Sequence, residues 1–309
     1  MSHHKILTAT LISLVSWGLG EYLAMSKVDA GFWKSSSLRV MEDKQLTLEP
    51  EHDFIPSWSP DGAKIAFTSY RNGGEDIWVM DADGKNPRQL TADSKGDWSP
   101  AWSPDGKQIA FTSDRTGSNQ IWIMNADGSS PRSLTVAAPM PETWNRDPSF
   151  SPDGTKLIFT SNRSGKDENW IMDIMTGEVW RHSDGMAEHW HPSFSPDGNK
   201  VLFSSNMTGE WGLWLSNLEG KQLTRMVPDK RFDNNPAASW SPDGSQIVFR
   251  TAEANLWLMK SDGTQAIPLT LDGKVDGWRS SWSPDSRKVA YTASRSEDGN
   301  SDIWVITLR

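Results

Sequence analysis

Residues 102–113 read WSPDGKQIAFTS, a turn sequence followed by a short apolar run. In Ser103-Pro104-Asp105-Gly106, proline presets φ at the second turn position and glycine accepts a positive φ at the last, so a tight turn between two strands is predicted. The run Gln108–Ser113 is rich in residues that favour strands. Its apolar side chains occupy both alternating faces, so we expect both faces of this strand to be buried.

This turn sequence recurs along the whole chain. Ser-Pro-Asp-Gly or its variant Ser-Pro-Asp-Ser begins at Ser59, Ser103, Ser151, Ser195, Ser241 and Ser283, with spacings of 44, 48, 44, 46 and 42 residues. A period in the forties is typical of one supersecondary unit per repeat. Within a unit, Ile121–Met124 predicts a third strand, and the run ending Ser133-Leu134-Thr135 predicts a fourth after an Asp-Gly turn.

Six such sheets of four antiparallel strands cannot be stable alone, but packed face to face around an axis they bury both faces of their middle strands. The sequence therefore predicts an all-β, six-bladed β-propeller over residues 42–309. The chain ends on a third strand, Ile303–Leu308, whereas Gln45-Leu46-Thr47 resembles a fourth strand with no first three before it. We expect this N-terminal strand to close the last blade.

Composition narrows the function. The formal net charge of −9 would repel a phosphate backbone, so nucleic acid is not expected as a partner. Cysteine is absent, which excludes disulfides, thiolate metal sites and cysteine nucleophiles. Neither a phosphate-binding glycine motif nor a Gly-x-Ser-x-Gly nucleophile motif occurs. A non-catalytic, monomeric protein without a cofactor is the expectation.

The first thirty residues have the layout of an export signal. Lys5 precedes an apolar run over residues 6–19, and small residues follow at Ala24, Ser26 and Ala30. Residues 1–30 are therefore interpreted as a signal peptide or, if uncleaved, a membrane anchor, with residues 31–41 as a linker. A periplasmic or secreted protein is expected, with membrane attachment only in the uncleaved case.

Fourteen of the 18 tryptophans fall into three sets by repeat position. Two sets are expected in the core: one on the third strands and one just before the turns. They are Trp78, Trp122, Trp170, Trp214, Trp257 and Trp304, and Trp58, Trp102, Trp240 and Trp282. A third set lies in the connections between blades, which differ in length, and variable loops on a rigid scaffold are where binding usually resides.

The third set predicts a ligand-binding mouth of the central channel. The predicted mouth residues are Phe54, Trp98, Trp144, Arg146, His189, Trp190, Phe232, Trp278 and Arg279. Flat amphipathic rings suit a protein or peptide partner. The alternative, that these rings only pack neighbouring blades together, stays open because a sequence does not say which way a loop ring points.

Polar residues in the same connections allow two further interpretations. Carboxylates and amides converging on the axis would suit Ca²⁺, although solvated loop carboxylates and turn caps are favoured and no metal site is predicted. An enzyme acting on a glycan is the alternative function, with His189 or His52 plus neighbouring carboxylates as acid and base. Arg146, Arg231 and Arg279 would then hold a substrate carboxylate.

The repeat Pro100–Arg115, followed by Ile121–Gly128, resembles that of the TolB-type, or WD-like, β-propeller family over roughly residues 42–309. The resemblance implies a six-bladed propeller that binds a protein or peptide at its mouth in the cell envelope. The same repeat occurs in transport accessory proteins, peptidase propellers and sugar-acid lyases, so it is specific for fold rather than for function. Two departures, Ser286 in the last turn and Trp180-Arg181-His182 in place of a Leu-Thr ending, suggest distorted or specialised blades.

Overall fold

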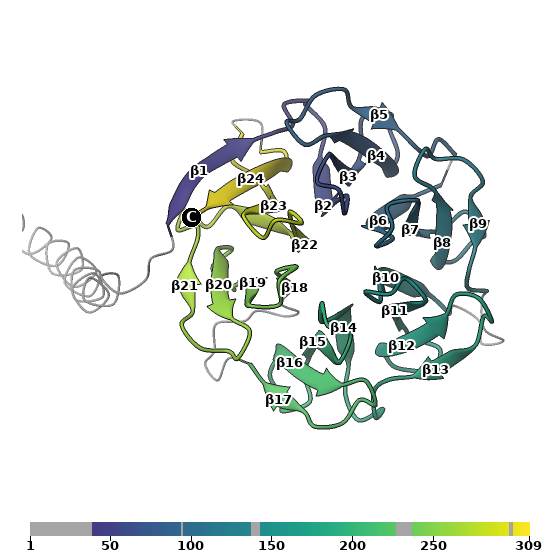
Figure 1. The fold of residues 1–309 in the computed structure, drawn as a ribbon. Helices are drawn as coiled ribbons and strands as arrows, with labels where there is room; N and C mark the ends of the chain where they lie inside the picture. Colours follow the sequence, from purple (N-terminus) through teal and green to yellow (C-terminus); the bar gives the residue numbers. More distant parts are fainter. Residues whose placement is uncertain (1–38, 94, 137–142, 227–236, 297–298) are drawn as a thin grey trace, which may run out of the picture. The chain divides into compact units, whose positions relative to one another are not determined.

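The computed structural model describes residues 39–93, 95–136, 143–226, 237–296 and 299–309. In this part of the chain, six four-stranded sheets surround a central channel, so the predicted six-bladed all-β propeller is confirmed (Figure 1). The propeller unit comprises residues 42–307, and residues 1–41 with 308–309 form a second unit. The predicted leader lies outside the described residues. Among those described, no helix is long and apolar enough to cross a membrane.

Blades 1 to 6 are numbered in chain order, and each has an innermost strand beside the channel (Figure 1). The innermost strands are β2 (Asp53–Trp58), β6 (Asp97–Trp102), β10 (Asn145–Phe150), β14 (His189–Phe194), β18 (Ala238–Trp240) and β22 (Val275–Trp282). The second strands are β3 (Lys64–Ser69), β7 (Gln108–Ser113), β11 (Lys156–Ser161), β15 (Lys200–Ser205), β19 (Gln246–Arg250) and β23 (Lys288–Ala293).

The remaining strands lie farther from the channel. The third strands are β4 (Asp76–Asp81), β8 (Gln120–Asn125), β12 (Glu168–Asp173), β16 (Gly212–Asn217), β20 (Leu256–Lys260) and β24 (Asp302–Leu308). The outer strands are β5 (Arg88–Gln89), β9 (Arg132–Ser133), β13 (Val179–Arg181), β17 (Thr224–Arg225), β21 (Ile267–Pro268) and β1 (Val40–Gln45).

The last blade has the sheet order β1-β24-β23-β22, so the N-terminal strand closes the ring as predicted. β1 begins earlier than the sequence suggested, at Val40. The predicted strand residues still make the outer-strand contacts: Leu46 N–H donates to the Ile303 carbonyl at 2.8 Å, and Thr47 Oγ1 donates to the Asp302 carboxylate at 3.1 Å.

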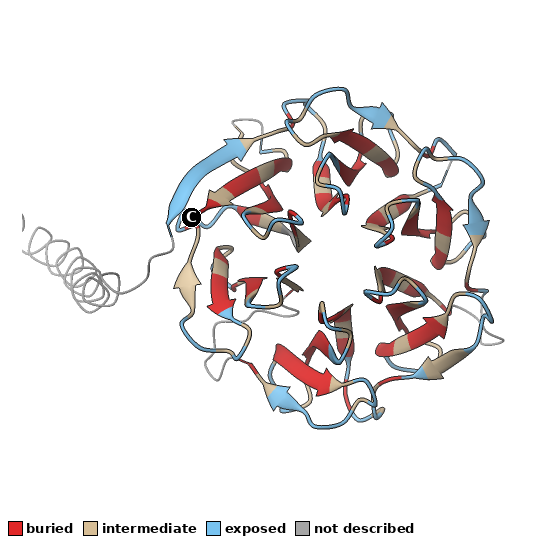
Figure 2. Ribbon diagram, viewed as in Figure 1, coloured by how far each residue is buried: buried red, intermediate tan, exposed pale blue. Residues whose placement is uncertain are grey.

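The core lies between blades, where the faces of adjacent sheets meet. One cluster joins Ala66 and Ile77 of blade 1 to Ile109, Phe111 and Met124 of blade 2, and equivalent clusters follow around the ring. Figure 2 shows the buried residues concentrated in the inner three strands of each blade, while the outer strands are mostly exposed. The expectation that the second strand buries both of its faces is therefore confirmed, because Ile109–Ser113 are all buried.

The tryptophans predicted as core are less buried than expected. Trp58, Trp214 and Trp282 are buried, and the other seven are half-buried. Four third-strand rings lie beneath an arginine of the same blade, in the pairs Arg71–Trp78, Arg115–Trp122, Arg163–Trp170 and Arg295–Trp304. The rings thus form the outer boundary of the core, and arginines cover them.

The six Ser-Pro-Asp turns share the same side-chain hydrogen bonds. In blade 1, Ser59 Oγ donates to Asp61 at 2.6 Å and accepts from the Lys64 N–H at 2.9 Å. In the last turn Ser286 takes the place of glycine with a φ of 57°, and its N–H donates to the Ser283 carbonyl at 2.9 Å. Its hydroxyl accepts from the Asp243 N–H of blade 5 at 3.2 Å, so this turn keeps the common geometry.

The second departure from the repeat links two blades. Trp180 packs against the cluster that contains Phe203 and Trp214 of blade 4. His182 is buried, with its Nε2 3.0 Å from Ser216 Oγ and its Nδ1 3.2 Å from the Leu218 carbonyl, both in blade 4. Burial lowers the pKa of His182 to about 4. The altered strand ending therefore ties blade 3 to blade 4.

Candidate functional site

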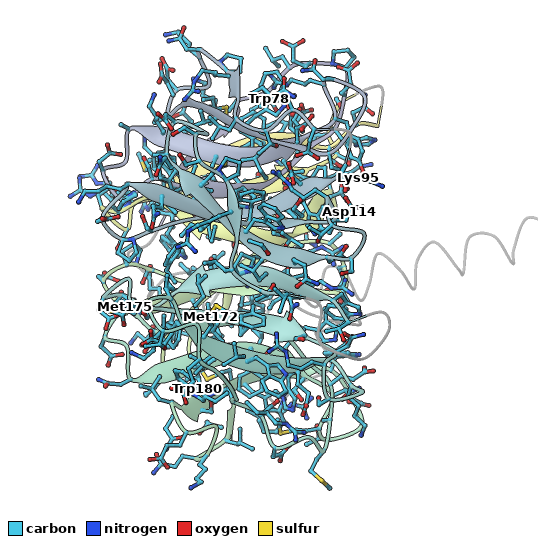
Figure 3. The ribbon with its side chains drawn as sticks, turned by 90° about the vertical axis from the view of Figure 1, so that its right-hand side faces the viewer. Trp78, Lys95, Asp114, Met172, Met175 and Trp180 are labelled. Atoms are coloured by element: carbon cyan, nitrogen blue, oxygen red, sulfur yellow. The ribbon has the colours of Figure 1, made fainter. Side chains whose placement is uncertain are left out.

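The propeller has two different faces. The turns that follow the innermost and third strands lie on one face, called here the turn face. The connections between blades, and the loops between second and third strands, lie on the other, called the connection face. In the side view of Figure 3, Met175 of a turn lies on one side, and Lys95 and Asp114 of the connections and loops lie on the other.

The predicted mouth residues lie where the innermost strands begin, at the connection face. Phe54, Trp98 and Trp190 are each the second residue of their strand and are half-buried. In blade 3 this position holds Arg146, while Trp144 precedes the strand. Phe232 lies outside the described residues, and Trp278 is placed in β22 without a described side chain.

The three described aromatic residues at this strand position have different neighbours. The Phe54 ring lies 5.7 Å from that of Tyr70 in its own blade. The Trp98 ring lies over Gly96, beside the carboxylate of Glu75 in blade 1. The Trp190 ring lies 5.7 Å from that of Trp144, and Arg146 packs against both, with its guanidinium carbon 3.7 Å from the Trp144 ring centroid and 4.5 Å from that of Trp190.

Beneath the mouth, the first residue of the innermost strand is buried and pairs with an arginine in three blades. Arg71 donates to Asp53 at 2.7 Å, Arg115 to Asp97 at 2.7 Å, and Arg163 to Asn145 at 2.7 Å. In blade 4 these two positions hold His189 and Met207. The structure therefore places His189 inside the blade rather than on the mouth surface.

Neither ring nitrogen of His189 has a hydrogen-bond partner among the described residues. Its ring is 2% exposed and packs 5.2 Å from that of Phe203. The nearest acidic atom is Asp184 Oδ1, 4.0 Å from Nε2. Burial lowers the pKa of His189 to about 4, so the imidazole is neutral at physiological pH.

Arg279 bridges the central channel. It belongs to β22, and its side chain donates to main-chain carbonyls of β10 and β14, strands that lie across the ring from β22 (Figure 1). Its Nη1 donates to the Pro148 carbonyl at 3.1 Å, and its Nη2 donates to the Asp147 and Pro192 carbonyls at 3.2 and 3.0 Å. A guanidinium thus occupies the axis where the sequence allowed a Ca²⁺ ion. In the described part of the chain, no three His, Asp or Glu side chains are grouped to hold a metal.

A buried ionic cluster surrounds this arginine. Ser99 Oγ donates to Asp147 Oδ1 at 2.9 Å, and His191 Nδ1 lies 3.2 Å from Asp147 Oδ2. Burial by itself would raise the pKa of Asp147, but His191, Arg279 and Arg146 together hold it well below its usual range. Asp147 is therefore ionised and balances the positive charge on the axis.

This cluster depends on a bulge in the innermost strands. In blades 1 to 4 the third residue of the strand has a positive φ, at Ile55, Ser99, Asp147 and His191. The strain is offset by bonds between blades, since the Asp147 N–H donates to Thr112 Oγ1 of blade 2 and the Ile55 N–H to Thr292 Oγ1 of blade 6, both at 3.2 Å.

On the turn side of Arg279 the channel forms a cavity of about 240 Å³. Its walls are prolines, alanines, serines and the aromatic residues that precede the turns, and Arg279 is the one charged residue among them. This guanidinium therefore separates the cavity from the mouth on the connection face.

The histidines proposed for an enzyme do not come together. His52 belongs to the connection before β2, where its Nδ1 accepts from the Ser301 N–H at 3.0 Å. His189 begins β14, and β2 and β14 lie on opposite sides of the channel (Figure 1). Of the proposed arginines, Arg279 donates to main-chain carbonyls and Arg231 lies outside the described residues. Arg146 remains at the mouth.

The sequence analysis allowed carboxylates on the axis but did not pair Asp147 with His191 and Arg279 there, and it did not place Asp167 beside Arg146. Burial raises the pKa of Asp167 to about 6, with Glu188 adding to the effect and Arg146 opposing it. A signal for the axis was present in the repeat, because the position four residues before each turn holds charged or titratable groups in three blades: Asp147, His191 and Arg279.

Comparison with known structures agrees with this architecture. A protein of Agrobacterium tumefaciens described as a TolB is 23% identical, with a TM-score of 0.67 over 88% of this chain and 99% of that one. TolB from Acinetobacter baumannii is 22% identical, with a TM-score of 0.62 over 83% of this chain and 63% of that one. An oligogalacturonate lyase from Vibrio parahaemolyticus is 14% identical, with a TM-score of 0.59 over 88% and 98%.

These structural likenesses show the fold, and they include proteins with different activities. A sequence model of a family goes further. The model described as TolB beta propeller domain matches residues 36–143 and 146–309, nearly the whole chain after the predicted leader. The chain therefore belongs to the TolB β-propeller domain family.

Proposed function

We propose that this chain is a non-catalytic binding protein of the cell envelope that holds a segment of another protein on its connection face. One observation carries the proposal. Large apolar side chains with at least three quarters of their surface exposed gather in the connections between blades. They are Leu48 at 81%, Val136 at 79%, Met186 at 79% and Leu271 at 75%.

Their distribution differs between the two faces. Among the described residues, Met175 is the one comparably exposed apolar side chain on the turn face. The four on the connection face come from four different connections, two of which also carry Trp144 and Trp190. Exposed apolar groups on loops that vary between repeats favour an interaction surface over a structural role.

The Arg279 side chain that bridges the channel supports binding across the mouth rather than passage through the ring. Arg279 bonds to carbonyls of blades 3 and 4 across the channel. A ligand on the connection face would therefore lie over this side chain. An extended peptide that lies over Arg279 would contact connections from several blades.

Export to the envelope rests on the sequence of residues 1–30 alone. The alternative function, an enzyme acting on a glycan, has less support. Its proposed acid and base, His52 and His189, lie in opposite blades, and His189 is buried with a lowered pKa.

The test is affinity capture from an envelope extract, with partners identified by mass spectrometry. The bait variant carries Leu48→Ser, Val136→Ser and Leu271→Ser, which leave the core untouched because these side chains are exposed. The matched control is Met175→Ser on the turn face. A protein captured by the wild type and the control but lost from the triple variant supports the proposal. Equal capture by all three proteins, or by none, contradicts it.

A further inference from the structure

Arg146 differs from the other arginines that stack on aromatic rings. Arg71, Arg115, Arg163 and Arg295 each lie over two rings and also donate to an acidic or amide side chain. Arg146 packs against two indoles but makes no hydrogen bond or ion pair with any described residue. Arg225 also lacks an acceptor, but it lies on the outer strand β17, over a single ring at 6.0 Å.

The unused donors are partly shielded from water. Arg146 is half-buried, and its Nε has no partner and almost no solvent contact; the same holds for the indole N–H of Trp190 beside it. A guanidinium that has lost part of its water and has no acceptor is costly, and an anion that bonded to its solvent-accessible N–H groups would offset that cost. The arrangement therefore favours a ligand with an acceptor group.

We propose that Arg146, held by Trp144 and Trp190, binds a free carboxylate of a peptide segment on the connection face. The indoles cover the guanidinium and hold it in place, so its edge is left to donate two parallel hydrogen bonds to one carboxylate. This inference rests on the proposed function and names the chemical group that the surface recognises.

The surrounding charges favour a carboxylate over a phosphate. Asp167 and Glu188 lie on the same face, Asp147 lies below, and the whole chain carries a net charge of −9. These carboxylates oppose any anion at Arg146, but they oppose a dianion or a polyanion more strongly than a single carboxylate, which the guanidinium attracts through two hydrogen bonds.

Exposed apolar side chains in the two connections that lead to Trp144 and Trp190 favour a peptide over a sugar acid as the source of the carboxylate. The connection that carries Trp144 also carries Val136, and the connection that carries Trp190 also carries Met186, each 79% exposed. These apolar side chains suit the side chains of a peptide better than the hydroxyl groups of a sugar.

The experiment follows the indole N–H resonances of the full chain, with those of Trp144 and Trp190 assigned from single Trp→Phe variants. The probes are N-acetyl-Leu-Ala-Ala with a free C-terminus, its C-terminal amide, N-acetyl-Leu-Glu-Ala amide and digalacturonate. The protein variants are Arg146→Gln and Arg146→Lys, with Arg132→Gln as a control that removes the same charge from the exposed outer strand β9.

We expect the two peptides with a carboxylate to shift both resonances, and the amide without one to bind at least tenfold more weakly. Arg146→Lys keeps the charge but lacks the planar fork, so about a tenfold loss is expected, with a larger loss for Arg146→Gln and none for Arg132→Gln. Equal binding of the acid and the amide overturns the inference. Unchanged binding to Arg146→Lys, which is informative even if Arg146→Gln fails to fold, also overturns it.

Two outcomes separate this inference from the proposed function. If Arg146→Gln captures the same envelope partner as the wild type and the peptides bind without regard to the carboxylate, the carboxylate site is wrong and the binding function stands. If digalacturonate alone shifts the Trp144 and Trp190 resonances, the peptide assignment is overturned together with the proposed function.

Discussion

His189 shows how a single substitution changes a repeated pair. Three other blades hold an acid or amide bonded to arginine at this place, whereas blade 4 holds His189 and Met207. Losing the arginine removes the hydrogen-bond donor, and the imidazole is left buried with neither nitrogen bonded. Its lowered pKa means that the folded chain binds a proton less readily than the unfolded chain.

Acid should therefore destabilise the fold through His189. Its folded pKa is about 4 against an ordinary 6.5, so its contribution to stability is present above pH 6.5 and is lost as the pH falls to 4. A loss of roughly 2–3 kcal/mol is expected from this residue, and His182 adds a similar one. In His189→Phe, urea unfolding at pH 7, 5.5 and 4 should show about half the acid sensitivity of the wild type. An unchanged slope with pH would contradict this.

Asp167 should act in the opposite direction. Its folded pKa of about 6 lies above the ordinary 3.8, so between these values the folded chain holds a proton that the unfolded chain has lost. Ionisation therefore weakens the fold as the pH rises. We expect Asp167→Asn to be about 1 kcal/mol more stable at pH 7.5, a value reduced for its partial exposure, with no difference left near pH 3.5. Thermal unfolding measures this, with the exposed Glu178→Gln as the matched control.

At the scale of elements, the turns form the most regular part of the molecule. Each turn serine both donates to its aspartate and accepts from the main chain, as Ser103 does with Asp105 and Gln108. The hydroxyl of Ser103, followed by the Lys107 N–H, lowers the pKa of Asp105.

Ser103→Ala should therefore destabilise the chain by about 1–2 kcal/mol through the lost hydrogen bonds. It should also move the pKa of Asp105 up towards its ordinary value, measurable by NMR titration of the carboxyl carbon. The control is Thr116→Ala, at an exposed position of the loop between β7 and β8 on the opposite face. A stability loss without a change at Asp105 would mean that the hydroxyl does not bond to that carboxylate.

The regularity of the elements explains what the sequence could predict. The turn and the two-faced apolar strand recur six times, so the fold follows from local rules applied in register. The arrangement of the mouth residues does not follow from these local rules, because it depends on differences of single residues. Arg146 takes the strand position of Trp98 and Trp190, and Trp144 precedes it.

The contents of the channel were equally hidden from sequence. The sequence placed Arg279 among the ligand-binding residues of the mouth and could not show its actual partners, which are main-chain carbonyls more than 80 residues away in the chain. Asp147 and His191 have positive φ angles, which Asp and His adopt more often than most residues, but the residue type alone does not say where this conformation occurs. Tertiary contacts between blades decide these positions.

At the scale of the whole molecule, stability depends on ring closure. Gln45 and Thr47 both bond to the Asp302 carboxylate, 257 and 255 residues away. Without this strand, blade 6 would expose an unpaired edge, and the packing between blades 6 and 1 would lose Leu46.

A chain that begins at residue 48 should therefore melt at a lower temperature than one that begins at residue 39. A decrease of roughly 10 °C or more is expected, because one blade loses its outer strand and its contacts with its neighbour. Calorimetry on the two truncated chains provides the measurement. Equal melting temperatures would show that the strand is dispensable.

The pairing of β1 with β24 also sets the order in which the ring can form during translation. A ribosome makes β1 before the other described strands and β24 after them, so these two strands cannot pair until β24 has been synthesised. Five blades can assemble on the growing chain, while the sixth waits for β24. A product that stops short of Asp302 keeps an open edge, because the hydrogen bonds that close the ring also require its last strand.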